Sequence, residues 1–310
     1  MKTIDLFCGA GGLSEGFTQA GYDVAWGVDF DGTTLETWDA NHDGEAIQAD
    51  LAEPSPREFY DEHEIDVDDI NCVIGGPPCQ GFSVAGEQAD DDERNNFVFV
   101  FADHVNYVQP DTFVMENVKG MLSAEDGSLV DRLVSDFESF GYSVEYRVMD
   151  AHEYGVPQKR QRAIFQGVKE GGVSWPKKTT ADSPPSVSSA IDDLPRLSAG
   201  EDSDINGHNA INHRDETVAK LRDTPHGQAA HPAYARADPD EPAYTIVAGK
   251  ASPPVHHSQP RRCTVRETAR IQTFPDTFTF PDDSSRKERY QMVGNAVPVE
   301  LARRVAESLQ

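Results

Sequence analysis

The sequence predicts an α/β fold in which a sheet of mainly parallel strands is followed by a smaller, loop-rich domain. The first half of the chain alternates short apolar runs with helix-like stretches, the pattern of a parallel sheet with crossover helices. Polar or otherwise special residues stand at the ends of several apolar runs, and the composition changes near Gly171. The 310 residues are enough for two modest domains, each with its own core.

Seven apolar runs predict the strands, and helical periodicity fills gaps between them. We expect strands at Thr3–Phe7, Asp23–Asp29, Ala46–Asp50, Asn71–Gly76, Thr112–Val118, Ser143–Asp150 and Arg162–Val168. We expect helices at Gly12–Ala20, Thr33–Asn41, Asn95–Tyr107 and Ser128–Phe140. Ligands of doubly wound sheets bind beyond the carboxyl ends of the strands, so the residues that end these runs are the first candidates for a site.

The part of the chain from Gly171 to Val255 has a different character. It holds scattered histidines and a stretch rich in Pro, Ser, Thr and Asp at Thr179–Ser203, a composition typical of loops. Helical periodicity returns at Val265–Gln272 and Glu300–Ser308. We therefore expect a second domain or a long insertion here.

The composition is strongly acidic, with 54 Asp and Glu against 27 Lys and Arg and a formal charge of −27. The acids are spread along the chain, a pattern that resembles proteins of salt-in halophiles. We expect neither a membrane span nor a secretory signal, because no run of 18 apolar residues occurs and the start lacks a charged and apolar leader. The four cysteines form no CxxC pair, which suits a reducing cytoplasm.

Basic residues gather in two islands on this acidic chain. Pro157–Lys178 carries six bases and one acid, and Lys250–Arg270 carries five bases and one acid. The islands could form one nucleic-acid face, or they could be ordinary solvated surface. We expect no metal site, because His256, His257 and Cys263 have no ligand spacing of a known type. The histidines are expected on a recognition surface, and Cys72 and Cys263 in the core.

A glycine loop follows the first predicted strand, in the segment DLFCGAGG at 5–12. Glycines let the backbone approach a nucleotide-like cofactor closely, and Asp29 ends the next strand where a carboxylate could bind ribose hydroxyls. The GxGxxG pattern of dinucleotide-binding proteins fails because position 14 is Ser. An NAD-dependent enzyme is therefore not expected, and a structural turn is the other interpretation of the loop.

The segment GGPPCQGFS at 75–83 places Cys79 in a loop stiffened by two prolines after a strand. A thiolate there could act as a covalent nucleophile, and Glu116 ends the next strand. A nucleophilic thiol, a carboxyl group and an S-adenosyl-L-methionine-type loop together fit the methylation of cytosine at C5. This carbon is too weak a nucleophile to accept a methyl group directly. Attack of a thiolate on C6 moves electron density to C5, and an acid near N3 supports that charge.

These segments together resemble the DNA (cytosine-5) methyltransferase family. The resemblance rests on DLFCGAGGLSEGF at 5–17, GGPPCQGFS at 75–83, ENV at 116–118, QKRQR at 158–162, RRCTVRETARIQTFPDTF at 261–278 and QMVGNAVPV at 291–299. It implies a Rossmann-like sheet that binds S-adenosyl-L-methionine (AdoMet), with S-adenosyl-L-homocysteine (AdoHcy) as product. It also implies a catalytic domain at 1–170 plus 286–310 and a target-recognition domain at 171–285.

The resemblance implies a role for individual residues. Cys79 would attack C6, Glu116 would bind or protonate N3, and Arg160 and Arg162 would hold the flipped base and support the cysteine. The implied cofactor contacts are Phe7, Cys8, Gly9, Gly11, Gly12, Leu13, Asp29, Phe30, Asp50, Leu51, Pro78, Asn295 and Val297. The implied DNA contacts are Gln80, Ser83, Thr245 and Arg262.

Two features depart from the family pattern. The family commonly has Glu at the position of Asp29, and a shorter carboxylate should still bind AdoMet. The loop after Cys79 carries five acids where DNA should approach, namely Glu87, Asp90, Asp91, Asp92 and Glu93. These acids either face away from phosphate or are tolerable only in high salt.

The expected partner is duplex DNA, and the expected state is a monomer in the cytoplasm. A cognate restriction endonuclease could exist, without a stable complex. Two alternatives remain open: a tRNA cytosine-5 methyltransferase, and a non-catalytic DNA-binding regulator on the same fold. The tRNA branch of the family typically carries a Cys-Phe-Thr segment, which this chain lacks. A non-catalytic regulator should have lost Cys79, Glu116 or the glycine loop, and all three are present.

Overall fold

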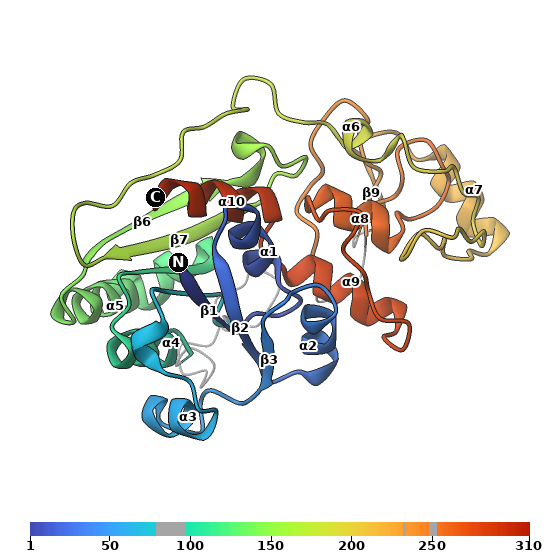
Figure 1. Cartoon of the computed structure of the whole chain (residues 1–310). Coiled ribbons are helices and arrows are strands. Elements are labelled where there is room, and N and C mark those ends of the chain that lie inside the picture. Colours follow the sequence, from blue (N-terminus) through green and yellow to red (C-terminus); the bar gives the residue numbers. More distant parts are fainter. Residues whose placement is uncertain (79–96, 232–233, 248–252) are drawn as a thin grey trace. The chain divides into compact units, whose positions relative to one another are not determined.

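A computed structural model describes residues 1–78, 97–231, 234–247 and 253–310, and in it the chain forms two compact units. The first, which we call the sheet unit, comprises Met1–Met149, Gln161–Pro176 and Ala302–Gln310. The second, the small unit, comprises Asp150–Arg160 and Lys177–Leu301. Figure 1 shows the helices and strands of both.

Seven strands form the sheet in the order β3-β2-β1-β4-β5-β7-β6. They are β1 (Lys2–Leu6), β2 (Asp23–Asp29), β3 (Glu45–Gln48), β4 (Cys72–Gly75), β5 (Thr112–Val118), β6 (Ser143–Asp150) and β7 (Gln161–Val168). All seven predicted strands are confirmed, and their ends differ from the predicted ends by at most two residues. The pairs among β1 to β5 are parallel, but β7 runs antiparallel to β5.

The expectation of a parallel sheet is therefore wrong for β7. Residues 151–160 alone separate β6 from β7, and a parallel return needs a crossover of about a dozen residues or more. The chain consequently turns back, and β7 lies between β5 and β6.

The strand order reverses between β1 and β4. The chain runs outward through β2 and β3 and then returns to place β4 beside β1, which makes this pair the switch point at which doubly wound sheets bind ligands. Leu6 pairs with Gly75 there. A Cβ on Gly75 would lie 2.4 Å from the Leu6 carbonyl oxygen, so only glycine permits this pairing. The loops after β1 and β4 therefore leave the sheet side by side.

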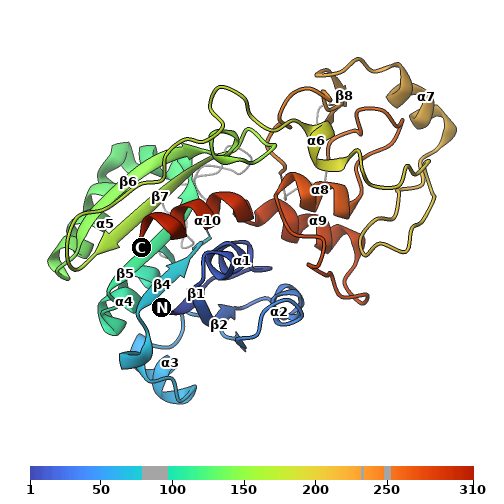
Figure 2. The same ribbon diagram turned by 45° about the horizontal axis from the view of Figure 1, so that its top comes forward.

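Helices cover both faces of the sheet. The helices α3 (Pro56–Glu62), α4 (Phe97–Val108) and α5 (Ser128–Ser139) pack on one face, and their apolar side chains join those of the strands in one core. On the other face lie α1 (Gly12–Gln19) and the end of α10 (Val299–Ser308), and α2 (Gly32–Asp39) packs beside β2 and β3 (Figure 2). The 3₁₀ helices among the described residues are η1 (Val67–Asp69), η4 (Lys119–Gly127), whose backbone is non-helical at residues 124–126, and η5 (Ala151–Tyr154).

The small unit has little regular structure, as its composition predicts. Its helices are α6 (Val187–Ile191), α7 (Asp215–Asp223), α8 (Val265–Ile271) and α9 (Arg286–Asn295), and β8 (Ala229–His231) pairs with β9 (Tyr234–Ala235). Apolar residues of α6 and α8 form a small core with Cys263 and Ile246. None of the helices among the described residues could span a membrane.

The units differ in their bounds from the predicted domains at 1–170 plus 286–310 and at 171–285. Helix α9 belongs to the small unit, because it packs on α8 and the Tyr290 hydroxyl donates to the Cys263 carbonyl oxygen at 2.6 Å. Residues 150–160 belong there too. The functional assignment of the two domains stays a prediction.

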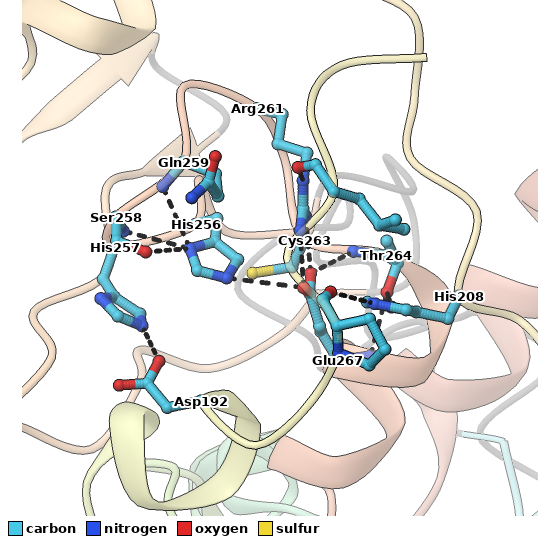
Figure 3. A network of polar contacts seen from close by, with 12 residues as sticks. Asp192, His208, His256, His257, Ser258, Gln259, Arg261, Cys263, Thr264 and Glu267 are labelled. Carbon is cyan, nitrogen blue, oxygen red and sulfur yellow. Dashed lines mark hydrogen bonds and ion pairs between the residues drawn. The ribbon is translucent and has the colours of Figure 1, made fainter. Parts of the chain in front are cut away.

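A buried polar network holds the interior of the small unit together (Figure 3). The guanidinium of Arg261 donates to both carboxylate oxygens of Glu267, at 2.8 and 2.7 Å, and both side chains are at most 1% exposed. Glu267 also accepts the Thr264 backbone N–H at 2.7 Å and so caps α8. His208 lies between the Thr264 hydroxyl and the Pro195 carbonyl oxygen.

His256 and His257 are part of this interior, so the expectation that they lie on a recognition surface is wrong. His256 accepts the backbone N–H groups of Ser258 and Gln259 on Nδ1, and burial lowers its pKa to about 4. His257 stacks on His256, and its Nε2 lies 2.6 Å from a carboxylate oxygen of Asp192. The loop folds inward because these polar partners satisfy both rings. Cys72 and Cys263 are buried, as predicted.

Candidate active site

The glycine loop after β1 has the backbone that its sequence predicts. Phe7 and Gly9 adopt positive φ angles of 59° and 54°, and Gly11 has φ 93°. A Cβ on Gly11 would lie 2.3 Å from the His42 ring, so this position requires glycine for space as well as for conformation. Helix α1 begins directly afterwards at Gly12. Gly12 and Leu13 are both buried in its first turn.

Asp29 connects this loop to the end of β2. One carboxylate oxygen accepts the Gly9 backbone N–H at 2.9 Å, and the other accepts the Asp31 N–H at 3.0 Å. Burial raises the pKa of Asp29, although these N–H groups oppose the shift. Each carboxylate oxygen has two lone pairs, so both can still accept a hydroxyl donor.

Apolar surface lies next to this carboxylate. The Phe30 side chain is 67% exposed, an unusual state for a large aromatic residue. After β3, Asp50 is exposed and Leu51 is buried. A carboxylate, an uncovered phenyl ring and a glycine backbone that a ligand can approach closely are the groups that a nucleoside requires, so the residues fit the adenosyl part of AdoMet.

A buried chain of polar groups beneath the loop escaped the sequence analysis. The Ser14 hydroxyl donates to Asp5 at 2.6 Å, and the Trp38 indole N–H donates to Ser14 at 2.8 Å. Burial raises the pKa of Asp5 to about 7. The spacing from Asp5 to Ser14 gave no signal, because their contact depends on how α1 packs against β1.

The loop after β4 is fixed to β5 by an amide. Asn117 donates from Nδ2 to the Pro77 carbonyl oxygen at 3.3 Å, and Pro77 is buried. Gly75 pairs with Met115, which sets Gly76 opposite Glu116, and a Cβ on Gly76 would lie 3.5 Å from a Glu116 carboxylate oxygen. Sequence reasoning assigned no role to Asn117, although its place in the ENV segment was a signal.

Some predicted site residues lie outside the described residues. They are Cys79, Gln80 and Ser83, together with the five acids Glu87, Asp90, Asp91, Asp92 and Glu93. Pro78 is the last described residue before them and is half-buried. The described part of this segment therefore passes Glu116 at Gly76, three residues before Cys79.

Glu116 and Arg162 form a close ion pair on adjacent strands of the sheet unit. Arg162, the second residue of β7, pairs with Val118 of β5, and its Nε lies 2.6 Å from Oε1 of Glu116. The two side chains are only 13% and 11% exposed, which shields the pair from water. Arg162 also donates to the Gln161 carbonyl oxygen at 2.8 Å. The structure thus joins two of the predicted catalytic residues.

Arg160 belongs to the small unit and has different surroundings. Its side chain is 1% exposed, and its guanidinium donates to the carbonyl oxygens of Ile246, Gly294, Asn295 and Ala296. Arg261 and Arg266, both fully buried, likewise bind groups of the protein. Part of each basic island is therefore buried, whereas Lys159, Lys169, Lys177 and Lys178 of the first island are exposed.

The remaining predicted residues are also in the small unit. Thr245 is exposed and donates from its hydroxyl to the Lys159 carbonyl oxygen at 2.7 Å, and Arg262 is half-buried. Asn295, at the end of α9, is exposed, and Val297 is buried. Among the described residues, no group of three His, Cys, Asp or Glu side chains could hold a metal ion.

The strand order and the glycine loop at its switch point define a methyltransferase of the AdoMet-dependent class. The chain belongs to the C-5 cytosine-specific DNA methylase family, whose model matches residues 1–310. It is therefore an enzyme that methylates C5 of cytosine in DNA, and the family and fold imply AdoMet as the methyl donor. The tRNA and non-catalytic alternatives are not favoured.

Two Type II methyltransferases are similar to this chain over nearly its whole length. The Type II methyltransferase M1.HphI of Haemophilus parahaemolyticus is 36% identical over 324 residues, covering 99% of this chain and 86% of the relative. M.DdeI of Desulfomicrobium norvegicum is 32% identical over 370 residues, covering 100% and 88%.

Solved structures show the same fold. A candidate DNA modification methyltransferase encoded within an E. coli prophage superposes with a TM-score of 0.86 at 26% identity, covering 100% of this chain and 98% of that one. The Dnmt2 methyltransferase of S. pombe has a TM-score of 0.69 at 16% identity, covering 98% and 96%. At that identity the second likeness shows the fold alone.

Proposed function

We propose that Cys79 is the nucleophile of the methyl transfer and that Glu116 supports it at N3 of the target cytosine. The thiolate adds to C6 and C5 then accepts the methyl group. Transfer of the C5 proton to a base restores the C5–C6 double bond and breaks the C6–S bond, which releases the thiolate. AdoMet, when bound, supplies an electrophilic methyl group on sulfur. The observation that carries the proposal is the position of Glu116 against Gly76, three residues before Cys79.

Glu116 is well prepared for a role in which it contacts the base. Its carboxylate is nearly buried and bound by Arg162, so its orientation is fixed before DNA arrives. A fixed, partly desolvated acid stabilises charge on N3 better than a mobile one in water. Asn117 supports the same edge, because its bond to Pro77 ties the loop that leads to Cys79.

The cofactor contacts follow from the ends of β1, β2 and β3. In this proposal Asp29 binds the ribose hydroxyls, and Phe30, Asp50 and Leu51 contact the adenine. Phe7, Cys8, Gly9, Gly11, Gly12, Leu13 and Pro78 complete the contacts from the sheet unit, and Asn295 and Val297 contribute from the small unit. The open space beside Gly9, where a Cβ would meet no atom within 4 Å, supports a ligand there.

The small unit is proposed to recognise the DNA sequence. Thr245 and Arg262 are its candidate contacts, with Gln80 and Ser83 of the catalytic loop. The target cytosine must leave the duplex to reach Cys79, which costs a few kcal/mol of unstacking and unpairing. The names of the Type II relatives suggest a restriction–modification role, in which a monomeric enzyme protects sites from a cognate endonuclease.

A covalent trap tests the nucleophile. Duplex DNA in which 5-fluorocytosine replaces cytosine allows attack on C6 and methylation, but fluorine cannot leave C5 as a proton does. The protein incubated with this DNA and AdoMet should form a complex that survives denaturation, seen as a shift in intact mass. Peptide mapping should place the adduct on Cys79.

Two cysteine variants complete the test. Cys79→Ala should form no adduct, whereas Cys263→Ala removes a buried thiol of the small unit and should retain adduct formation. An adduct on another residue, or undiminished methylation by Cys79→Ala, would contradict the proposed mechanism.

A further inference from the structure

Arg160 joins two segments of the small unit that are far apart in the sequence. One terminal nitrogen of its guanidinium donates to the Ile246 carbonyl oxygen at 3.0 Å. The other lies 2.9 Å from the carbonyl oxygen of Gly294 and 3.1 Å from that of Ala296. The two terminal nitrogens of Arg160 thus connect the segment that contains Ile246 to the turn at the end of α9.

A pair of glutamines makes the same connection independently. Gln158 accepts the Ile246 backbone N–H at 2.9 Å and donates to the Gln272 side chain at 2.7 Å. Gln272 in turn donates to the carbonyl oxygens of Val293 and Ala296, at 2.7 and 3.2 Å. Gln158 and Gln272 are both completely buried. Neither residue was singled out from the sequence.

The backbone around Thr245 is bound to Lys159, which lies between Gln158 and Arg160 in the sequence. The Lys159 backbone N–H donates to the Ala243 carbonyl oxygen at 2.8 Å, and the Thr245 hydroxyl donates to the Lys159 carbonyl oxygen. Tyr244 and Thr245 are exposed while Ile246 is buried, so the segment presents two side chains outward on a fixed base.

We propose that Arg160 is a positioning residue which, with Gln158 and Gln272, couples the turn at 294–297 to the recognition segment 244–246. The inference rests on the proposed function, in which Asn295 and Val297 contact the cofactor and Thr245 contacts DNA. Occupation of the cofactor site then orders the recognition segment, and by linkage DNA bound at Thr245 strengthens cofactor binding.

The physical basis is the cost of separating these groups. The guanidinium and amide groups are buried, so a carbonyl that moves away leaves an unsatisfied donor with no water to replace it. Displacement of the turn must therefore carry the Arg160 side chain with it, and the Ile246 carbonyl follows. A lysine at position 160 keeps the charge but lacks the fork that binds both segments at once.

Hydrogen exchange with AdoHcy as the probe tests the coupling without a known DNA sequence. In the wild-type protein, saturating AdoHcy should slow exchange at 243–247, and at the Ile246 amide above all, by about 5-fold or more. Arg160→Lys should still bind AdoHcy in calorimetry, but exchange at 243–247 should no longer respond. If this variant does not fold, Gln272→Met should show a clearly reduced response.

Arg266→Lys is the matched control. Arg266 is also a fully buried arginine of the small unit, but it donates to the carbonyl oxygens of Asn206 and Pro275 instead. Its variant should be destabilised to a similar degree and keep the wild-type response to AdoHcy. A merely structural role would make the two variants alike.

Two results would overturn the coupling. One is a wild-type response in Arg160→Lys with AdoHcy bound, and the other is a wild-type protein that binds AdoHcy without any change at 243–247. Failure of the wild-type protein to bind AdoHcy would instead overturn the proposed cofactor contacts, and the coupling with them.

Discussion

Arg160 and Arg162 stand two positions apart in one motif, but the structure gives them separate tasks. Arg162 pairs with Glu116 in the sheet unit, whereas Arg160 binds backbone carbonyl groups of the small unit. The division between the units falls between Arg160 and Gln161. The motif marks both arginines, but it cannot say which belongs to which unit.

Replacing Arg162 by lysine tests the value of the ion pair. Arg162→Lys keeps the positive charge but loses the Nε–H that lies beside Glu116, so the carboxylate is held less firmly. We expect kcat to fall by about 10²-fold, measured with labelled AdoMet on duplex DNA, while AdoHcy affinity is unchanged.

The surface arginine Arg147 provides the control. It belongs to the same unit and is 56% exposed, so Arg147→Lys should leave kcat unchanged. Activity of Arg162→Lys close to that of the wild-type protein would show that Glu116 does not depend on this pair.

Short helices account for much of what the sequence left unpredicted. Helices α3 and α9 both begin with a capping box, Ser55 with Glu58 and Ser285 with Glu288. These signals are visible in the sequence, but neither helix has a regular apolar stripe, because each is anchored by a few buried residues such as Tyr60 and Tyr290. Periodicity predicts the longer α4 and α5 well.

The buried ion pair between Arg261 and Glu267 should dominate the stability of the small unit. Glu267→Gln keeps the capping geometry but removes the charge that Arg261 needs, leaving a buried guanidinium without its anion. We expect a loss of about 3–5 kcal/mol of unfolding free energy in urea titrations. In Asp276→Asn, which removes an anion 57% exposed beside Arg270, the loss should be at most about 1 kcal/mol.

The same pair sets a dependence on pH. Burial alone would raise the pKa of Glu267, but the hydrogen bonds from Arg261 hold it below the ordinary value of 4.5. The stabilisation is therefore present above about pH 4.5 and is lost as the pH falls through the lower pKa of the folded state. Urea titrations below pH 4.5 should show the wild-type protein losing its advantage over Glu267→Gln. If the wild-type protein and Glu267→Gln had the same free energy of unfolding at pH 7, this explanation would be contradicted.

The chain as a whole carries a formal charge of −27 and still acts on a polyanion. Arg160, Arg261 and Arg266 are buried and bind groups of the protein, so these three bases of the islands are not available for phosphate contacts. In molar salt, release of counterions from DNA adds little affinity, and base-edge contacts must then carry recognition. The likeness to proteins of salt-in halophiles stays a prediction.

The sequence predicted the sheet and the ends of its strands because these follow from local patterns. It could not predict the partners of the Arg160 and Gln158 side chains, because these contacts span 86 to 136 residues and depend on the fold of a loop-rich unit. His257 gave no sign of burial for the same reason, because its partner Asp192 is 65 residues away in the sequence. Roles implied by the family resemblance stay predictions wherever Cys79 or the cofactor is involved.

Methylation of C5 of cytosine within one short duplex sequence is tested directly by mapping the modified bases. Mixed-sequence duplex DNA, incubated with the purified protein and AdoMet at ~0.1 M and ~3 M KCl, is mapped by bisulfite sequencing. We predict protected cytosines at a single short motif, and none with Cys79→Ala. Binding of AdoMet without any protected cytosine in duplex DNA would contradict the account.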